Sequence, residues 1–231
     1  MEQSFVAWAK MRARRLPQVK LGIGDDAAIL DGLNKAGSNE AGSNEAGSNE
    51  DWVVTTDTLM DGEHFKSSDV SGERIGRKLI SVNLSDLAAM AAEPVAVFLS
   101  LCLPRSASQQ LAADIYEGVC QVAERYQIAL AGGDTNCWDG PLVISLTAIG
   151  TTVGGVAWVR SGALPGDAIV VTGPLGGSIL GKHLDFEPRI ELARLIRDGI
   201  KVHAAMDISD GLSTDLLRMC DASHCGAVLD L

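Results

Sequence analysis

Two stretches of the chain repeat apolar residues at the spacing of an amphipathic helix. The first, residues 71–92, is predicted to be a long helix that Pro94 ends. The second, residues 111–126, predicts another helix, for which Ser106 and Gln109 offer a capping box. The apolar positions behind these predictions are Ile75, Leu79, Val82 and Leu87 in the first stretch and Leu111, Ile115, Val119, Val122 and Tyr126 in the second.

Shorter apolar runs around these helices predict β-strands. Up to residue 150 the predicted strands are 27–30, 52–55, 95–103, 128–131 and 142–150. An irregular apolar pattern before Pro17 predicts an opening helix. Helices and strands mixed in this order predict an α+β unit.

The composition of the sequence changes near residue 151, where glycine-containing segments and a Pro165-Gly166-Asp167 turn follow the last predicted strand. We therefore place a domain boundary between residues 1–150 and 151–231. The second part predicts three strands: one at 168–171, one that ends near Ile208, and one at 227–231. It also predicts helices at 190–197 and 212–220. A terminal strand with nothing after it is an aggregation hazard. We therefore expect this second domain to be incomplete.

The pentapeptide Ala-Gly-Ser-Asn-Glu is written three times, at residues 36–50, between two predicted strands. It has no hydrophobic face and is rich in turn-forming residues. We expect a flexible, solvated hairpin loop without a functional role.

Charge and cysteine content narrow the class of protein. The chain has 19 Lys and Arg against 30 Asp and Glu, a net charge of −11, which argues against nucleic acid as a non-specific partner. Its five cysteines form no C-x-x-C pair, which favours reduced thiols in a cytoplasmic protein. The longest strongly apolar stretch, 95–103, is too short to span a bilayer, so no membrane partner is expected.

Five short motifs combine aspartate with Gly, Ser, Thr or Asn. If the fold gathers them, their like charges need a cation, and hard oxygen donors select Mg²⁺ or Ca²⁺. This pattern predicts magnesium-dependent phosphate chemistry. The motifs are Gly24-Asp25-Asp26, Thr55-Thr56-Asp57-Thr58, Asn83-Leu84-Ser85-Asp86, Gly132-Gly133-Asp134 and Asp207-Ile208-Ser209-Asp210-Gly211.

Each motif alone has an ordinary structural explanation. Asp25 and Asp26 fit a turn, Asp57 fits the end of a strand, and Asp210 fits a helix cap. Asp86 is harder to explain, because burying it in an otherwise apolar helix without a partner costs several kcal/mol. The five motifs together shift the balance toward a shared site.

Two single residues remain open between two interpretations. His64 is either a surface loop residue or a donor to substrate, and Arg160 is either a solvated charge or a bidentate grip on phosphate. The run Gly176–Lys182 imitates a P-loop, but His183 stands where the motif needs Ser or Thr. We interpret that run as an ordinary glycine-rich start of a helix.

The motifs, read in order with their neighbours, resemble those of thiamine-monophosphate kinases, within the aminoimidazole-ribonucleotide-synthetase-like superfamily. The resemblance spans almost the whole chain. It rests on Gly22–Ala28, Thr55–Leu59, His64-Phe65, Val82–Met90, Gly132–Thr135 and Asp207–Leu212.

The resemblance implies an ATP-dependent cytoplasmic transferase of thiamine biosynthesis that phosphorylates thiamine phosphate. It also implies a two-domain α+β protein whose first domain binds metal and ATP and pairs with a second subunit in a homodimer. Carried over by motif, the Mg²⁺ ligands would be Asp26, Thr55, Thr56, Asp57, Asp86, Asp134, Asp207 and Asp210. ATP would contact Gly133, Asp134, Arg160 and Ser209, and His64 would contact the substrate.

Transfer between two anions needs charge neutralisation more than acid–base catalysis, so we predict direct transfer without a catalytic side chain. The family continues past the segment that resembles 227–231, with residues that help to hold thiamine. Two alternatives therefore stay open: a catalytically impaired dimer that binds Mg-nucleotide, or another ATP-using enzyme of the superfamily.

Overall fold

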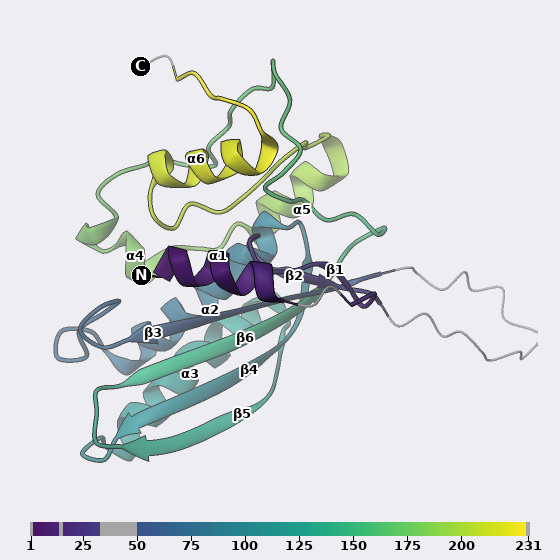
Figure 1. The fold of residues 1–231 in the computed structure, drawn as a ribbon. Helices are drawn as coiled ribbons and strands as arrows, with labels where there is room; N and C mark the ends of the chain where they lie inside the picture. The colour runs from purple at the N-terminus through teal and green to yellow at the C-terminus, as the bar shows by residue number, and fades with distance from the viewer. Residues whose placement is uncertain (1, 14–15, 33–49, 230–231) are drawn as a thin grey trace, which may run out of the picture.

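A six-stranded mixed sheet forms the centre of the computed structural model, which describes residues 2–13, 16–32 and 50–229 (Figure 1). The strand order is β1-β2-β3-β6-β4-β5. β4 and β5 run parallel, and the other neighbouring strands run antiparallel. The strands are β1 (Val19–Leu21), β2 (Ala28–Leu30), β3 (Trp52–Met60), β4 (Glu93–Pro104), β5 (Ala129–Trp138) and β6 (Val143–Thr151).

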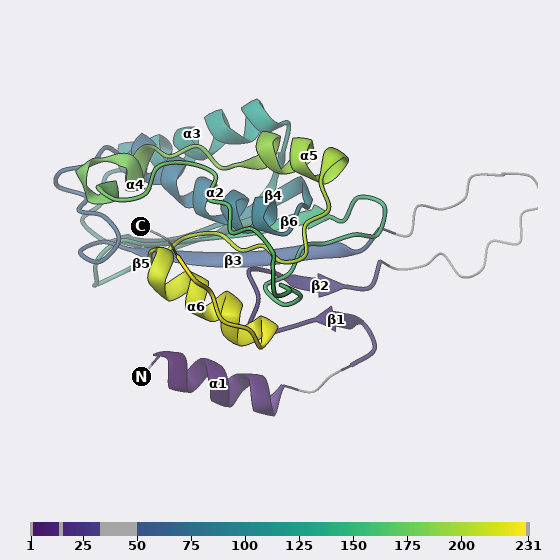
Figure 2. The same ribbon diagram turned by 90° about the horizontal axis from the view of Figure 1, so that it is seen from above.

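Helices cover the sheet unequally on its two sides. α2 (Gly72–Ala89) and α3 (Gln109–Tyr126) pack on one side, whereas α1 (Glu2–Arg12) and α6 (Leu212–Ser223) lie on the other (Figure 2). The short α4 (Lys182–Asp185) and α5 (Ile190–Gly199) pack against α2. Alternate residues of β6 and the apolar stripe of α2 meet in one core, which confirms the α+β fold.

Two strands are longer than the sequence predicts. β3 pairs with β6 from Trp52↔Thr151 to Met60↔Val143, so Asp57 lies within a strand and not at its end. β5 pairs with β4 as far as Pro104↔Trp138, so Gly132-Gly133-Asp134 lies within a strand and does not follow one. The neighbouring strand completes the backbone hydrogen bonds of these polar segments. The local pattern of apolar residues does not show this pairing, so it underestimates the length of both strands.

The strands predicted in the second part are wrong where the structure describes them. Residues 168–171, 202–208 and 227–229 are assigned no strand, because no neighbouring ladder completes their backbone hydrogen bonds. The helices predicted at 190–197 and 212–220 are confirmed as α5 and α6. Residues 36–49 of the repeat and 230–231 of the predicted last strand lie outside the described residues.

The start of α3 differs from the predicted capping box at Ser106. Ser108 is the N-cap, and its hydroxyl oxygen accepts a hydrogen bond from the backbone N of Leu111 at 3.1 Å. Ser106 lies in the preceding turn and is exposed. In the described part of the chain, no helix is both long and apolar enough to cross a membrane.

Ser108→Ala is expected to lower the free energy of unfolding by about 1 kcal/mol, because one N-terminal amide of α3 loses its acceptor. Ser106→Ala serves as the matched control and should leave stability within about 0.5 kcal/mol of the parent. Urea denaturation followed by circular dichroism measures both. Equal losses in the two variants would contradict the assignment of the cap.

Candidate metal centre

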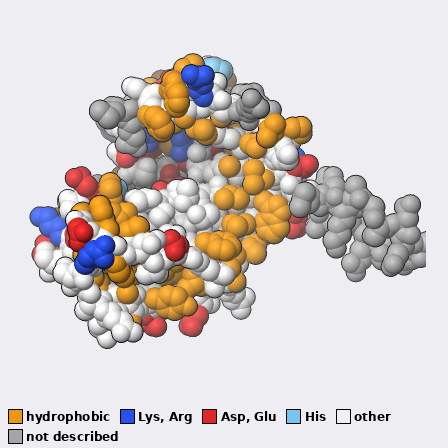
Figure 3. All heavy atoms as spheres, turned by 60° about the horizontal axis from the view of Figure 1, so that its bottom comes forward, with side chains coloured by type: hydrophobic (Ala, Val, Ile, Leu, Met, Phe, Trp, Pro, Cys, Tyr) orange, Lys and Arg blue, Asp and Glu red, His pale blue; other side chains and the backbone are white. Residues whose placement is uncertain are grey.

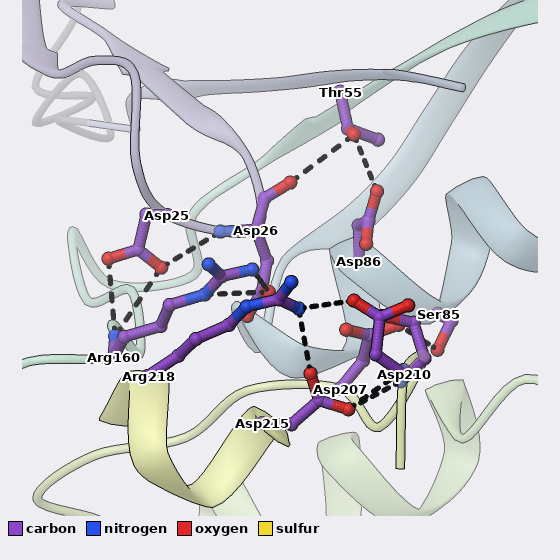
Figure 4. A network of polar contacts seen from close by, with 11 residues as sticks. Asp25, Asp26, Thr55, Ser85, Asp86, Arg160, Asp207, Asp210, Asp215 and Arg218 are labelled. Atoms are coloured by element: carbon purple, nitrogen blue, oxygen red, sulfur yellow. Dashed lines mark hydrogen bonds and ion pairs between the residues drawn. The ribbon is translucent and has the colours of Figure 1, made fainter. Parts of the chain in front are cut away.

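Three carboxylates from distant parts of the sequence meet in one place. Asp26 precedes β2, Asp86 lies on α2, and Asp207 lies in the segment that leads to α6 (Figure 4). One oxygen from each lies within 4.8 Å of the others. Asp26 is 8% exposed, so this cluster is not a solvated acidic surface.

Burial and mutual repulsion disfavour the charged forms of these carboxylates. Burial is the main cause that raises the pKa of Asp26 to about 7 and that of Asp86 to about 9. Burial also raises the pKa of Asp207, and that carboxylate in turn raises the pKa of both others. The cluster therefore needs positive charge before all three groups can ionise near neutral pH.

Each carboxylate accepts a hydrogen bond from a side chain of its own, yet one buried carboxylate oxygen has no hydrogen-bond partner. Arg160 Nε donates to Asp26 Oδ1 at 3.0 Å, Thr55 Oγ1 to Asp86 Oδ2 at 2.6 Å, and Ser85 Oγ to Asp207 Oδ2 at 3.2 Å. Asp26 Oδ2 is buried without a hydrogen-bond partner. A buried orphan oxygen within a set of hard oxygen donors fits Mg²⁺ or Ca²⁺.

Asp57, within β3, and His64, in the turn after β3, extend the site. Burial raises the pKa of Asp57, and the nearby His64 partly offsets this shift. Asp57 is also close enough to raise the pKa of Asp86 and Asp207. The backbone N of Met60 donates to His64 Nδ1 at 3.1 Å, which fixes the ring at the turn after β3.

The structure does not bring all predicted ligands into the cluster. Thr56 alternates with Thr55 along β3, so its side chain lies on the other face, where its hydroxyl contacts Leu146 O and Thr147 Oγ1. The strand register aligns Asp134 with Ser100, and Ser100 with Ser145 and Thr58, in a row on that same face. Within one chain, Asp134 therefore lies on the face away from the three carboxylates, and Gly133 lies on β5, with β6 and β4 between it and β3.

Asp210 and Ser209 border the cluster without joining it. Asp210 has a side chain that is 55% exposed and pairs with Arg218 Nη1 at 2.6 Å. The backbone N atoms of Ser209 and Asp210 both donate to Asp215 Oδ2 at 3.0 Å. Asp215 therefore anchors the loop that carries Asp207.

Three residues that hold the site in place are absent from the ligands and contacts that the sequence predicts. Asp25 accepts hydrogen bonds from the backbone N of Arg160, while Asp215 and Arg218 hold the loop that carries Asp207 (Figure 4). Asp215 stands in the first turn of α6, and an acidic residue at a predicted helix start is the sequence signal that could have found it. Asp25 belongs to the Gly24-Asp25-Asp26 motif but is not among the residues predicted to bind metal or substrate, and Arg218 offers no pattern that distinguishes it from a surface charge.

The run Gly176–Lys182, which imitates a P-loop, makes only local contacts through Lys182 and the neighbouring His183. Lys182 Nζ donates to Pro174 O at 2.8 Å, and a His183 ring nitrogen lies 2.9 Å from Ser178 O. The run forms a single 3-10 turn and the short α4, with no strand before it. It is a local glycine-rich connection.

Family comparisons cover both parts of the chain. Residues 24–152 match the family described as AIR synthase related protein, N-terminal domain. Residues 164–231 match AIR synthase related protein, C-terminal domain.

Individual relatives are similar over almost the whole chain. A thiamine-monophosphate kinase of Rhodopirellula baltica is 47% identical over 100% of this chain and 70% of its own length. The thiamine-monophosphate kinase of Escherichia coli K12 is 35% identical over 96% of this chain and 68% of its own. The solved structure "AaThiL complexed with AMPPCP and TMP" superposes with a TM-score of 0.76 at 26% identity, covering 96% of this chain and 70% of that chain.

Proposed function

The chain belongs to the thiamine-monophosphate kinases, within the AIR synthase related proteins, and from this membership we propose that it transfers the γ-phosphoryl group of ATP to thiamine phosphate. A terminal oxygen of thiamine phosphate attacks the γ-phosphorus while the bond to the β-phosphate oxygen breaks. The products are thiamine diphosphate and ADP. No phosphorylated protein forms in this scheme, because the acceptor already carries an ionised oxygen.

One observation carries this proposal: the cluster of Asp26, Asp86 and Asp207 with an unpartnered buried oxygen beside the Arg160 guanidinium. Kinases that lack a P-loop need another way to hold a polyphosphate. An acidic cluster and an adjacent cation provide sites for metal and for phosphate, respectively. The neighbouring structure with bound AMPPCP and TMP supports the same pair of reactants.

Mg²⁺ bound at this cluster would neutralise the charge of the two anionic reactants and so favour phosphoryl transfer between them. In the proposal Asp26, Asp86 and Asp207 hold the metal, with Thr55 and Asp57 beside them. Thr55 keeps the Asp86 carboxylate oriented through its hydroxyl, and Ser85 does the same for Asp207. Thr56, Asp134 and Asp210 remain proposed ligands that a single chain does not place in the cluster.

The phosphate side of the site would use Arg160 with Gly133, Asp134 and Ser209, and His64 would contact thiamine phosphate. Arg160 spans Asp25 through its backbone N and Asp26 through its side chain, so its guanidinium is held at the cluster. Its planar fork suits two phosphate oxygens better than lysine would. His64 is partly exposed in the turn after β3, where an acceptor substrate could reach it.

We also propose a homodimer formed through the face of β3, β6, β4 and β5 that lies opposite α2 and α3. Phe98, Thr56 and Asp134 lie on that face, away from α2 and α3. Figure 3 shows hydrophobic and uncharged groups over the middle of the visible surface and charged groups toward its margin. Light scattering with a Phe98→Asp variant tests this: the parent should have twice the mass of the variant.

The assay for the reaction incubates the folded protein with Mg-ATP and thiamine phosphate and separates the products by chromatography. We expect equimolar ADP and thiamine diphosphate, and none when EDTA replaces Mg²⁺. Binding of Mg-ATP without transfer would support the impaired nucleotide-binding alternative. A covalent phosphate trapped on the protein during turnover would contradict direct transfer.

Arg160→Gln is expected to lower kcat/KM for ATP by about 100-fold, because a charge-assisted fork to phosphate is replaced by a neutral amide. Arg105→Gln is the matched control. Arg105 pairs with Asp139 at the exposed end of the sheet, and its loss should leave kcat/KM within about twofold. Steady-state kinetics with varied ATP measure both variants, and equal effects would remove Arg160 from the proposed site.

A further inference from the structure

The C-terminal end of α6 holds two cysteines in a specific backbone arrangement. His224 ends the helix in the left-handed conformation, with φ 54° and ψ 39°. The backbone N of Cys225 donates to Cys220 O at 3.1 Å, and that of His224 donates to Asp221 O at 3.3 Å. This pair of hydrogen bonds is a Schellman motif, in which the side chains of the two outer residues contact each other.

Those two outer residues are Cys220 and Cys225. The motif brings their Cα atoms to a separation on the order of 6 Å, inside the range that a disulfide bridges. The two thiols are close enough to interact: the pKa of Cys220 is raised mainly by burial and also by the neighbouring Cys225 thiol. Both side chains are partly exposed, so a small reagent can reach them.

The remaining cysteines have no comparable neighbour. Cys102 and Cys137 lie on adjacent strands, but Cys102 pairs with Asn136 and Cys137 pairs with Leu103. An offset of one residue directs their side chains to opposite faces of the sheet. Cys120 lies on α3, where its thiol contacts Tyr116 one turn away.

We propose that Cys220 and Cys225 are a reversible dithiol–disulfide pair. One protein thiolate attacks a sulfur of a low-molecular-weight disulfide such as oxidised glutathione, and one glutathione thiolate leaves. The second protein thiolate then attacks the protein sulfur of this mixed disulfide and displaces the second glutathione thiolate. Two protein thiols are oxidised, one glutathione disulfide is reduced to two thiols, and the two protons pass to those thiols.

The position of the pair gives the disulfide a structural consequence. α6 begins at the loop anchored by Asp215 and carries Arg218, which pairs with Asp210. Cys220 follows Arg218 by half a turn, so the disulfide would close the last turn of the helix that holds this loop. Of the residues between the two cysteines, 221–223 belong to α6 and His224 ends the helix in the left-handed conformation, so the disulfide would covalently fix this helix end.

The test equilibrates the full chain with buffers of reduced and oxidised glutathione, blocks free thiols with an alkylating reagent, and maps peptides by mass spectrometry. We expect a species that is lighter by two hydrogens and whose disulfide maps to Cys220 and Cys225. Cys220→Ser and Cys225→Ser, each made separately, should abolish it, whereas Cys120→Ser should not. In the oxidised form, the Cys225 amide should exchange its hydrogen about tenfold more slowly, because the helix end opens less often.

Mixed glutathione adducts that persist on either cysteine of the parent protein would overturn the proposal. So would a disulfide mapped to any other pair. Each of the two serine variants removes the bond by itself, so the test still works if one of them misfolds. The peptide map of the parent protein tests the proposal without either variant.

Discussion

Asp86→Asn is expected to lower kcat for the proposed transfer by at least about 1000-fold and, without metal, to raise the free energy of unfolding by about 1–2 kcal/mol. The two effects have one cause. Asp86 is half-buried beside Asp26 and Asp207, where Thr55 Oγ1 donates a hydrogen bond to it and a bound cation would favour its charged form. An amide of the same shape carries no charge that burial and the neighbouring carboxylates disfavour, and it also removes a proposed metal ligand.

Added Mg²⁺ and ATP should reverse the order of stability between the two proteins. Ligands that bind the folded parent stabilise it by mass action, and the variant would lose this gain. Thermal unfolding with and without Mg-ATP, together with the product assay, measures both effects. Asp139→Asn is the control, since this carboxylate is 84% exposed and should change neither quantity.

Two results would contradict the prediction for Asp86→Asn. If Asp86→Asn kept activity within tenfold of the parent, Asp86 would not hold the metal. If the variant were less stable without metal, the Thr55 hydrogen bond would outweigh the repulsion among the carboxylates.

Gly76→Ala is expected to lower the free energy of unfolding by about 3 kcal/mol, because α2 and α3 cross in backbone contact at this position. A Cβ on Gly76 would lie 2.0 Å from Ile115 O, and a Cβ on Gly118 would lie 2.0 Å from Glu73 O. Both clashes are with backbone atoms of the facing helix, so no side chain can move aside. Gly118→Ala should therefore cost a similar amount.

The sign of this effect makes the test specific. Replacing glycine by alanine within a helix normally stabilises a protein by up to about 1 kcal/mol. Gly199, at the end of α5, has no atom within 4 Å of its ideal Cβ, so Gly199→Ala should be neutral or slightly stabilising. Urea denaturation of the three variants separates close packing from helix propensity, and a stabilised Gly76→Ala would refute the close crossing.

The Gly76 variant also connects packing to the site. α2 carries Asp86, so a wider crossing with α3 would shift Asp86 relative to Asp26 and Asp207. If Gly76→Ala remains folded, we expect weaker Mg²⁺ binding as well as lower stability. Gly199→Ala should leave Mg²⁺ binding unchanged, because α5 supplies no carboxylate to the cluster.

The sequence by itself determined the elements whose signal is local. The apolar spacing of α2 and α3 depends on neighbours within a few turns, and both helices form where that spacing predicts them; the helices predicted at 190–197 and 212–220 also form, as α5 and α6. The order of the aspartate motifs was sufficient to identify the family, because motif order does not depend on how the chain folds.

Tertiary structure alone decided which of those motifs meet. Thr55 and Thr56 are adjacent in sequence, yet strand alternation sends one to Asp86 and the other to the opposite face. Asp134 resembles the other motif aspartates in its sequence context, but the register across β3, β6, β4 and β5 places it away from them. The missing strands of the second part and the close crossing at Gly76 have the same origin: backbone pairing and helix contact join residues far apart in sequence, and no local pattern records which partner each segment meets.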